Sequence, residues 1–175
     1  YCIMHYLYNY KKYYFIDKFN PEQLIKQNKN ISLIWRNNNN NNEVFKLVNF
    51  CKKNKRDLYI ANNYKLAEKY NIKGVYISAK NYSLSYAQNP KGLKIIGSAH
   101  NLKEIQIKKI QKVKELFLAP VFKKKTNTPL GIYKLKHLFE IFKEDKIALG
   151  GVNFQNIKLL KLVDFKGFAG ISYFE

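Results

Sequence analysis

The repeated order of short apolar runs and helix-like segments constrains the fold of this chain more than any other feature. From residue 13 to residue 172, a short apolar run is followed by a loop and then by a segment with helical periodicity. The apolar runs are nearly continuous, which is typical of parallel strands covered on both faces. Eight strands are expected, at Tyr13–Ile16, Ser32–Trp35, Leu58–Ala61, Gly74–Ser78, Lys94–Ser98, Leu116–Ala119, Ile147–Gly150 and Gly167–Ser172.

Three of the segments between these runs carry an apolar stripe at helical spacing. The stripes are Val44, Leu47, Val48 and Cys51; Leu135, Leu138, Phe139 and Phe142; and a looser set of Leu102, Ile105, Ile110 and Val113. Asn101 and Asn153 stand where helix N-caps are expected, and Pro21 suits a first helical turn. The link from Asn81 to Asn89 is short and is expected to hold a single turn.

Strands that alternate with helices indicate βαβ units and a parallel sheet. Eight of them favour a compact (β/α)8 TIM barrel, an α/β fold that typically takes about 250 residues. The last helix is expected to be missing, because the sequence stops just after the eighth strand. An open doubly wound sheet is the alternative, but no GxGxxG segment follows the first strand and no Walker A motif occurs. We expect one barrel domain over residues 13–175, after an N-terminal extension at residues 1–12 to which the sequence assigns no role.

The chain is strongly basic, with 32 Lys plus Arg against 12 Asp plus Glu and a formal net charge of +20. Only Arg36 and Arg56 are arginine, the residue whose planar fork binds phosphate and guanine bidentately. The lysines are spread along the chain, so a solvated basic surface is favoured and nucleic-acid binding is an outside alternative. No apolar run approaches the roughly 18 residues of a membrane span. Cys2 and Cys51 form no disulfide framework, which favours a cytoplasmic location.

Two pairs of residues near the end of the chain predict a phosphate pocket. The active site of a parallel barrel forms at the carboxyl ends of its strands, and the last two strands commonly supply a phosphate site. Gly150 and Gly151 follow the seventh strand, and Gly170 and Ser172 lie on the eighth. Glycines let backbone N–H groups approach an anion closely. A tight turn without a ligand is the alternative for the Gly150–Gly151 pair.

Three further features at the same end of the expected barrel are candidates for chemistry. Arg36 ends the second strand and is a candidate for anion or diphosphate binding, with a surface salt bridge as the alternative. His100 would act as a general acid or base, because its unperturbed pKa lies near neutrality, or it has only a structural role. Lys123–Lys125 form a basic loop that would close over an anionic substrate or stay solvated. Asp17 is the one aspartate at this end, and this argues against a well-formed Mg²⁺ site.

The stretch from Ile95 to Ser172 resembles the thiamine phosphate synthase family, which includes a thiazole tautomerase branch. The segments that carry the resemblance are Ile96-Gly97-Ser98-Ala99-His100, Leu118-Ala119-Pro120-Val121-Phe122 with Thr126, Ala148-Leu149-Gly150-Gly151-Val152 with Asn156, and Gly167-Phe168-Ala169-Gly170-Ile171-Ser172. Upstream segments in the same order extend it to about residues 13–172: Ile34-Trp35-Arg36, Ile60-Ala61-Asn62-Asn63 and Gly74-Val75-Tyr76-Ile77.

The resemblance implies a barrel that joins hydroxymethylpyrimidine diphosphate to thiazole phosphate, two small phosphorylated substrates, and releases thiamine phosphate and diphosphate. It implies Mg²⁺ as the cofactor, which together with basic residues would stabilise the departing diphosphate. It places Arg36 at the diphosphate, Ser98 near the pyrimidine and Thr126 at the thiazole substrate. It also places Asn62 and Gly170 in the substrate site, and the backbone of Gly150, Gly151, Ile171 and Ser172 at the thiazole phosphate.

The sequence departs from the family pattern where the metal would bind. Asn62 and Asn81 stand at positions where the family has magnesium-binding aspartates, so no metal ligand is assigned. Three interpretations follow from these residues. The chain is a divergent thiamine phosphate synthase; or a thiazole tautomerase-like isomerase that uses His100 and no metal; or a non-catalytic protein that binds a phosphate ligand.

Overall fold

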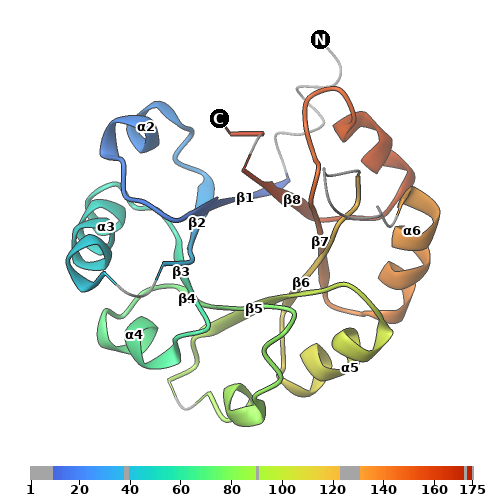
Figure 1. The fold of residues 1–175 in the computed structure, drawn as a ribbon, viewed down its shortest axis with the longest axis horizontal. Helices are drawn as coiled ribbons and strands as arrows, with labels where there is room; N and C mark the ends of the chain where they lie inside the picture. Colours follow the sequence, from blue (N-terminus) through green and yellow to red (C-terminus); the bar gives the residue numbers. More distant parts are fainter. Residues whose placement is uncertain (1–9, 38–39, 90, 123–130, 172, 175) are drawn as a thin grey trace.

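The computed structural model describes residues 10–37, 40–89, 91–122, 131–171 and 173–174. Eight parallel strands pair in chain order and close into a barrel, with β1 paired to β8 (Figure 1). The strands are β1 (Lys11–Ile16), β2 (Ile31–Trp35), β3 (Leu58–Ala61), β4 (Gly74–Ile77), β5 (Lys94–Ala99), β6 (Glu115–Leu118), β7 (Asp145–Leu149) and β8 (Gly167–Gly170). The predicted (β/α)8 barrel is therefore confirmed.

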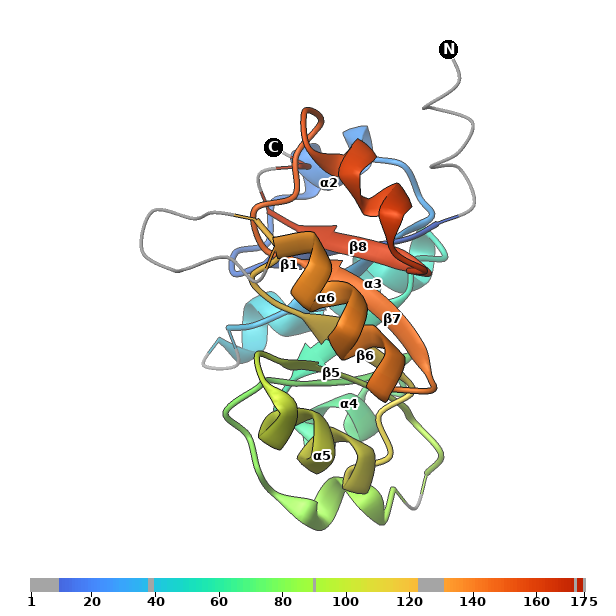
Figure 2. The same cartoon turned by 90° about the vertical axis from the view of Figure 1, so that its right-hand side faces the viewer.

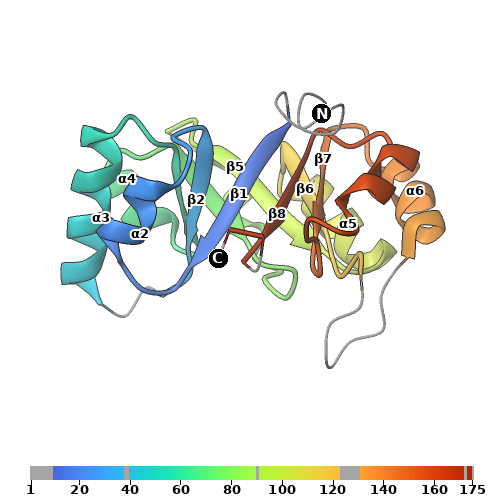
Figure 3. The same ribbon diagram turned by 90° about the horizontal axis from the view of Figure 1, so that it is seen from above.

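The helices lie outside the ring of strands, as Figures 1 and 2 show. They are α2 (Pro21–Lys26), α3 (Asn41–Lys53), α4 (Tyr64–Lys69), α5 (Leu102–Ile110) and α6 (Gly131–Ile141), with the 3₁₀ helices η1 (Leu84–Ala87) and η2 (Ile157–Leu162). In Figure 3, α2, α3 and α4 lie to one side of the strands and α5 and α6 to the other. Within the described residues no helix follows β8, and none of the helices there has the length and apolar character to span a membrane.

Side chains alternate along each strand between the inside of the barrel and the layer under the helices. On β1, Tyr13 and Phe15 belong to the inner cluster, while Tyr14 belongs to an outer one. Phe117 packs edge-on against the ring of Tyr13 at 4.9 Å and that of Tyr76 at 5.7 Å between centroids. Aromatic rings thus make up much of the inside of the barrel, and this packed interior supports the residues at the two ends of the strands.

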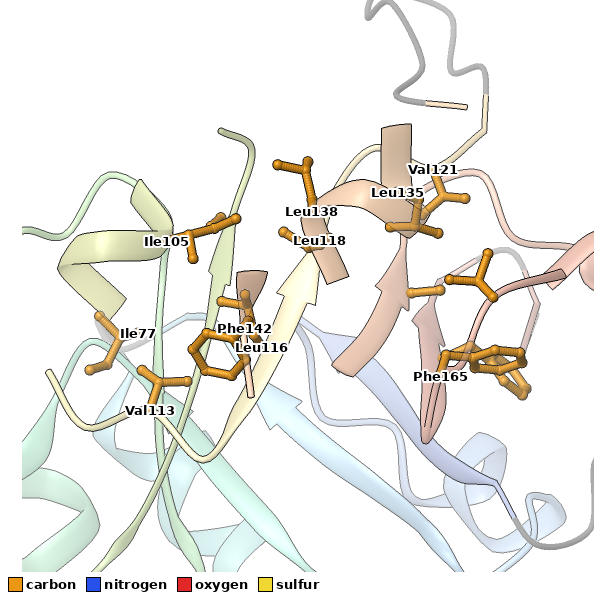
Figure 4. Close-up of a cluster of buried hydrophobic side chains, with 14 of the residues drawn as sticks. Ile77, Ile105, Val113, Leu116, Leu118, Val121, Leu135, Leu138, Phe142 and Phe165 are labelled. Carbon is orange, nitrogen blue, oxygen red and sulfur yellow. The ribbon is translucent and has the colours of Figure 1, made fainter. Parts of the chain in front are cut away.

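The largest outer cluster joins β6 to the helices α5 and α6. Leu116 and Leu118 point away from the barrel axis toward Ile105 of α5 and Leu138 of α6, and all four are buried (Figure 4). The predicted stripes on α3 and α6 are buried at each position described, while the side chain of Phe139 lies outside the described residues. Burial of these side chains on folding is the main stabilising contribution to the barrel wall.

The loose stripe predicted for α5 is wrong in part. Ile105 and Val113 are buried, but Leu102 and Ile110 are about half exposed, at 49% and 53%. The helix instead buries Glu104 and Lys108, because both side chains have polar partners on its buried side. Glu104 accepts the His100 backbone N–H, and Lys108 donates to the Asn81 carbonyl. The buried face of α5 therefore combines the apolar contacts of Ile105 with the polar contacts of Glu104 and Lys108.

Two of the predicted helix starts are confirmed and one is corrected. The Asn101 side chain accepts the Glu104 N–H and caps α5, and Pro21 occupies the first turn of α2. Asn153 was expected to cap a helix, but the N-cap of η2 is Asn156. Asn153 instead accepts the Asn156 N–H at 3.0 Å within the preceding turn. The link between β4 and β5 holds the predicted single turn, η1.

The amino end of the barrel is closed by a network around Glu115. Its carboxylate, which is 1% exposed, accepts hydrogen bonds from Lys11 and Lys94, each at 2.5 Å, and from the Tyr13 hydroxyl. Asp145 pairs with Lys11 at 2.6 Å. Charged residues therefore extend the strands here: β1 begins at Lys11 and β7 at Asp145, each two residues before its predicted start.

Candidate functional site

A cavity of about 420 Å³ opens at the carboxyl end of the barrel. It collects residues from the ends of β1, β2, β4, β7 and β8 and from the loops after β5 and β6. The residues that line it are Phe15, Arg36, Tyr76, Ser78, His100, Ala119, Pro120, Leu149, Gly150, Gly151, Val152, Gly170 and Ile171. Six predicted site residues thus share one cavity: Arg36, His100, Gly150, Gly151, Gly170 and Ile171.

The lining of the cavity combines aromatic and aliphatic side chains with polar groups. Phe15 and Tyr76 meet edge-on, with ring centroids 5.2 Å apart and planes at 80°. Pro120 and Leu149 contribute aliphatic surface, while Arg36, Ser78 and His100 contribute polar groups. A cavity with both kinds of lining is suited to a flat organic ring that carries a charged substituent.

Gly150 and Gly151 place backbone donors at the edge of the cavity. Their φ angles are +92° and +70°, values that L-residues with a side chain rarely adopt. A Cβ atom at Gly151 would lie 2.8 Å from the carbonyl oxygen of Phe122, so no side chain fits there. Among the described residues, no acceptor is found for the N–H groups of Gly150, Gly151 or Val152. These donors are therefore available to an anion, as the glycine pattern predicts.

Arg36 is the cationic side chain that lines the cavity, and it has a carboxylate partner. Its Nε donates to Asp17 Oδ1 at 2.8 Å and its second guanidinium nitrogen donates to Asp17 Oδ2. The guanidinium carbon also lies 5.5 Å from the centre of the Phe15 ring. The pairing with Asp17 fixes the direction of the guanidinium. Its remaining N–H donors are those with which it would reach a ligand.

Ser98 lies beneath the cavity and does not line it. The side chain is buried, and its Oγ accepts a hydrogen bond from the Tyr76 hydroxyl at 2.8 Å. Burial raises the pKa of Tyr76 to about 12, while the Ser98 hydrogen bond and Arg36 oppose that rise, so the phenol stays neutral. Tyr76, which the sequence analysis did not single out, is the residue of this pair that lines the cavity.

His100 is held at the cavity edge by Glu104. Its backbone N–H donates to Glu104 Oε2 at 2.6 Å, and its Nδ1 lies 3.0 Å from the same oxygen. A carboxylate at Nδ1 keeps the proton on that nitrogen and leaves Nε2 to accept or donate. Glu104 is in turn fixed as the third residue of α5, after its N-cap Asn101. The helix start thus orients the imidazole.

Asn62 and Asn81 form a closed amide network with Ser78. Asn62 Oδ1 accepts the Ser78 backbone N–H at 2.9 Å and the Asn81 Nδ2 at 3.1 Å. Asn62 Nδ2 donates to Ser78 Oγ at 3.0 Å, and Asn81 Oδ1 accepts the Ser83 N–H at 3.1 Å. The two positions at which the resemblance implies metal ligands are therefore neutral and engaged with their own neighbours. Within the described part of the chain, no cluster of His, Cys, Asp or Glu could hold a metal ion. The residues present do not fit Mg²⁺.

The buried Lys108 of α5 supports this network through the Asn81 carbonyl, and it was not predicted from the sequence. Lys108 is fully buried, and its Nζ donates to the Asn81 carbonyl and to Gln111 Oε1, both at 2.9 Å. Gln111 Nε2 donates to the carbonyls of Asn81 and Ser83. Gly97 on β5 leaves room for the lysine, because a Cβ there would lie 3.3 Å from Lys108 Cδ. The position of Lys108, one helical turn after Ile105 on the buried face of α5, is the signal that sequence analysis could have used.

Three predicted features fall outside the described residues. They are Thr126, Ser172 and the lysine loop Lys123–Lys125.

Comparison with known structures shows that this barrel recurs at low sequence identity. The thiamine phosphate pyrophosphorylase from Pyrococcus furiosus matches with a TM-score of 0.76 at 20% identity, over 94% of this chain and 86% of that one. The putative copper homeostasis protein CutC from Streptococcus agalactiae matches with a TM-score of 0.69 at 11% identity, over 92% and 98%. The YdjI aldolase from Escherichia coli K12 matches with a TM-score of 0.68 at 9% identity, over 93% and 76%. Likenesses at such identities establish the fold alone.

The sequence itself identifies the family. A comparison with curated protein sequences finds no match. A family model described as thiamine monophosphate synthase matches residues 35–174, which takes in the last residue of β2, all of β3 to β8 and all but Phe15 of the cavity lining. The chain belongs to the thiamine monophosphate synthase family, a family of transferases in thiamine biosynthesis.

Proposed function

We propose that this chain is a divergent thiamine phosphate synthase, which joins hydroxymethylpyrimidine diphosphate to thiazole phosphate. Membership of the family supports the proposal, and so does one observation in the cavity. Gly150 and Gly151 present N–H groups at the edge of a cavity of about 420 Å³ whose lining includes the rings of Phe15 and Tyr76. These N–H groups have no acceptor among the described residues. Such donors bind the phosphate of a ligand whose flat ring contacts Phe15 and Tyr76.

The other residues of the cavity fit the charge changes of this reaction. In the proposed reaction the bond from the pyrimidine methylene carbon to the diphosphate oxygen breaks, and the electron pair leaves with the diphosphate. The thiazole nitrogen then donates its lone pair to the cationic carbon. The developing negative charge lies on the leaving group, so Arg36 would stabilise it electrostatically. The aromatic faces of Phe15 and Tyr76 would stabilise the cationic pyrimidine through their ring quadrupoles.

A second candidate function is thiazole tautomerisation, and the His100–Glu104 pair is what favours it. An imidazole oriented by a carboxylate at the edge of a phosphate-binding cavity can remove a proton from one ring position and return it to another. That reaction needs no departing diphosphate. In this case His100→Ala abolishes tautomerisation, and unchanged tautomerisation in that variant would rule out the mechanism.

The synthase proposal is tested by incubating the protein with both substrates and measuring thiamine phosphate. Arg36→Gln is expected to lower kcat/KM by about tenfold or more, because a charge that stabilises the leaving group is lost. Lys46→Gln removes the same charge from the exposed surface of α3 and should leave kcat/KM unchanged. Absence of product at high enzyme concentration would exclude the synthase activity.

A further inference from the structure

The amide network beside the cavity, which reaches the lining through Ser78, has few oxygen lone pairs left for a cation. The Ser78 backbone N–H can only donate, so the Asn62 atom that faces it is the amide oxygen. That oxygen also accepts from Asn81, and a carbonyl oxygen has two lone pairs, so its capacity is filled. The Ser83 N–H identifies the Asn81 oxygen in the same way and takes one of its lone pairs. A cation that bound both amide oxygens would have to break the bonds to Asn62.

The carboxylates near the cavity are committed as well. Asp17 holds Arg36 through both of its oxygens. Glu104 accepts from the backbone and the ring of His100. Mg²⁺ surrenders its water reluctantly and generally needs one or two carboxylates beside the substrate phosphates. Mg²⁺ would have to compete with the Arg36 guanidinium for Asp17, and Glu104, which holds His100 through Oε2, would offer only its other oxygen.

A buried positive charge lies next to the amide network. The Lys108 ammonium touches the Asn81 carbonyl at 2.9 Å, on the helix side of the same residue whose side chain binds Asn62. A cation fixed at this position disfavours a second cation at the Asn62–Asn81 network, with the buried Glu104 carboxylate of the same helix offsetting part of its charge.

We propose that the cavity binds its phosphate-bearing ligand without a divalent cation, that Arg36 in its lining provides positive charge there, and that the Lys108 ammonium behind Asn81 disfavours a metal at the amide network. The inference rests on the proposed function in that it takes a phosphate or diphosphate as the ligand of this cavity. It differs from the family expectation in its consequence. Anion affinity is independent of Mg²⁺, and the network of Asn62 and Asn81 binds no metal on its own.

The first experiment measures anion affinity by calorimetry, in a chelator and then in millimolar Mg²⁺. Inorganic phosphate and inorganic diphosphate are the probes; phosphate is included because it forms only a weak complex with Mg²⁺ in solution. The dissociation constant of the wild-type protein for each anion is expected to agree within about twofold between the two conditions. An affinity that falls by about tenfold or more in chelator would overturn the proposal.

The second experiment uses Mn²⁺ alone, followed by its electron paramagnetic resonance signal, and needs no anion. The wild-type protein is expected to leave the Mn²⁺ signal unchanged. The double variant Asn62→Asp with Asn81→Asp restores two carboxylates and is expected to bind Mn²⁺ saturably. Asn42→Asp with Asn49→Asp makes the same charge change on the exposed surface of α3 and should not bind Mn²⁺. Saturable Mn²⁺ binding by the wild-type protein contradicts the proposal.

The two experiments separate the metal question from the proposed function. If neither phosphate nor diphosphate binds in either condition, the assignment of the cavity as a phosphate site fails, and the metal-free binding of that ligand fails with it. If phosphate binds only when Mg²⁺ is present, the proposed function survives and the metal-free inference is overturned.

Discussion

The two ends of this barrel treat charge in opposite ways. At the amino end, Glu115 is surrounded by two lysines and a tyrosine hydroxyl, so a buried charge meets opposite charge within hydrogen-bond distance. At the carboxyl end, the N–H groups of Gly150 and Gly151 have no acceptor within the described residues, and Lys108 is held by neutral oxygens. The charged groups around Glu115 are paired with one another, whereas the N–H groups of Gly150 and Gly151 lack an acceptor among the described residues.

This difference follows the division of labour typical of such barrels, in which the amino end serves stability and the carboxyl end serves chemistry. A satisfied ion network makes this end rigid, because Glu115 and Lys11 each have more than one partner in it. Unused donors and a cation with only neutral partners raise the energy of the free protein and are compensated when an anion binds. The ends can therefore be tested separately, by stability for one and by ligand affinity for the other.

The largest effect is expected at the amino end, from Glu115→Ala. The substitution removes the acceptor that Lys11 and Lys94 share, and breaking a buried ion pair typically costs about 3–5 kcal/mol. Lys11 keeps Asp145 and both lysines are partly exposed, so the lower end of that range is expected. The free energy of unfolding, measured with urea, should fall by that amount. Glu144→Gln breaks an exposed pair with Lys114 at 3.6 Å and should change it by about 0.5 kcal/mol or less. Equal effects of the two substitutions would mean that the network does not stabilise this end.

The same network predicts the behaviour of the protein in acid. Burial alone would raise the pKa of Glu115, but hydrogen bonds from Lys11, Lys94 and Tyr13 outweigh it, and the pKa is lowered. A carboxyl with a lowered pKa in the folded state contributes stability at pH values above its unfolded pKa, about 4.3, and that contribution is lost as the pH falls through the folded value. Glu115→Gln should therefore lose less stability than the wild type between pH 5 and lower values.

Lys108 predicts the opposite pH dependence. Its folded pKa, about 8, lies below the unfolded value of 10.5, so the unfolded chain binds more protons between these values and stability rises with pH. From pH 7 to pH 10 the wild type should gain stability relative to Lys108→Met, by an amount on the order of a few kcal/mol. Lys109→Met alters the neighbouring exposed lysine and should show no such difference. A constant gap between wild type and Lys108→Met across this range would contradict the assignment.

The comparison of the two ends also explains what sequence analysis could predict of the fold. Apolar runs reveal strands because burial on both faces is a local property of each run, and all eight strands were predicted. The strand starts at Lys11 and Asp145 were missed because charged residues there are paired across the barrel, with partners more than a hundred residues away. The same holds for α5, whose buried face includes Lys108 in place of the expected Leu102 and Ile110.

In the candidate site, too, features set by local sequence were predicted, and features set by contacts between distant segments were missed. Gly150 and Gly151 were predicted because a glycine pair after a strand reports a local backbone conformation, and their φ angles are positive. Tyr76 was missed because whether a strand residue faces the cavity depends on register, which a lone strand does not reveal. A salt bridge was the stated alternative for Arg36, but its partner Asp17 was not identified for the same reason, since the pair joins the ends of two strands.

The glycine donors at the carboxyl end are tested by Gly151→Ala. Its Cβ would lie 2.8 Å from the Phe122 carbonyl oxygen, so the backbone must shift and the N–H groups move. Affinity for inorganic phosphate, measured by calorimetry, is expected to fall about tenfold, equivalent to 1.4 kcal/mol. Gly92→Ala is a matched control, because Gly92 has a φ of +65° and open space around its Cβ position. If both variants bind phosphate as the wild type does, the glycine donors do not hold the anion.

The smallest effect is expected from Ser98→Ala, which asks whether this residue belongs to the ligand site or to its support. Ser98 accepts the Tyr76 hydroxyl at 2.8 Å and does not line the cavity, so its loss should lower the free energy of unfolding by about 1 kcal/mol. In a cycle with Tyr76→Phe, the double variant should lose less than the sum of the single variants, because one hydrogen bond is removed in each. Phosphate affinity should be unchanged in Ser98→Ala. A change in KM for the pyrimidine substrate without a change in stability would place Ser98 against the ligand. The ligand site would then include the layer of side chains directly below the cavity lining, and that layer would no longer count as packed interior.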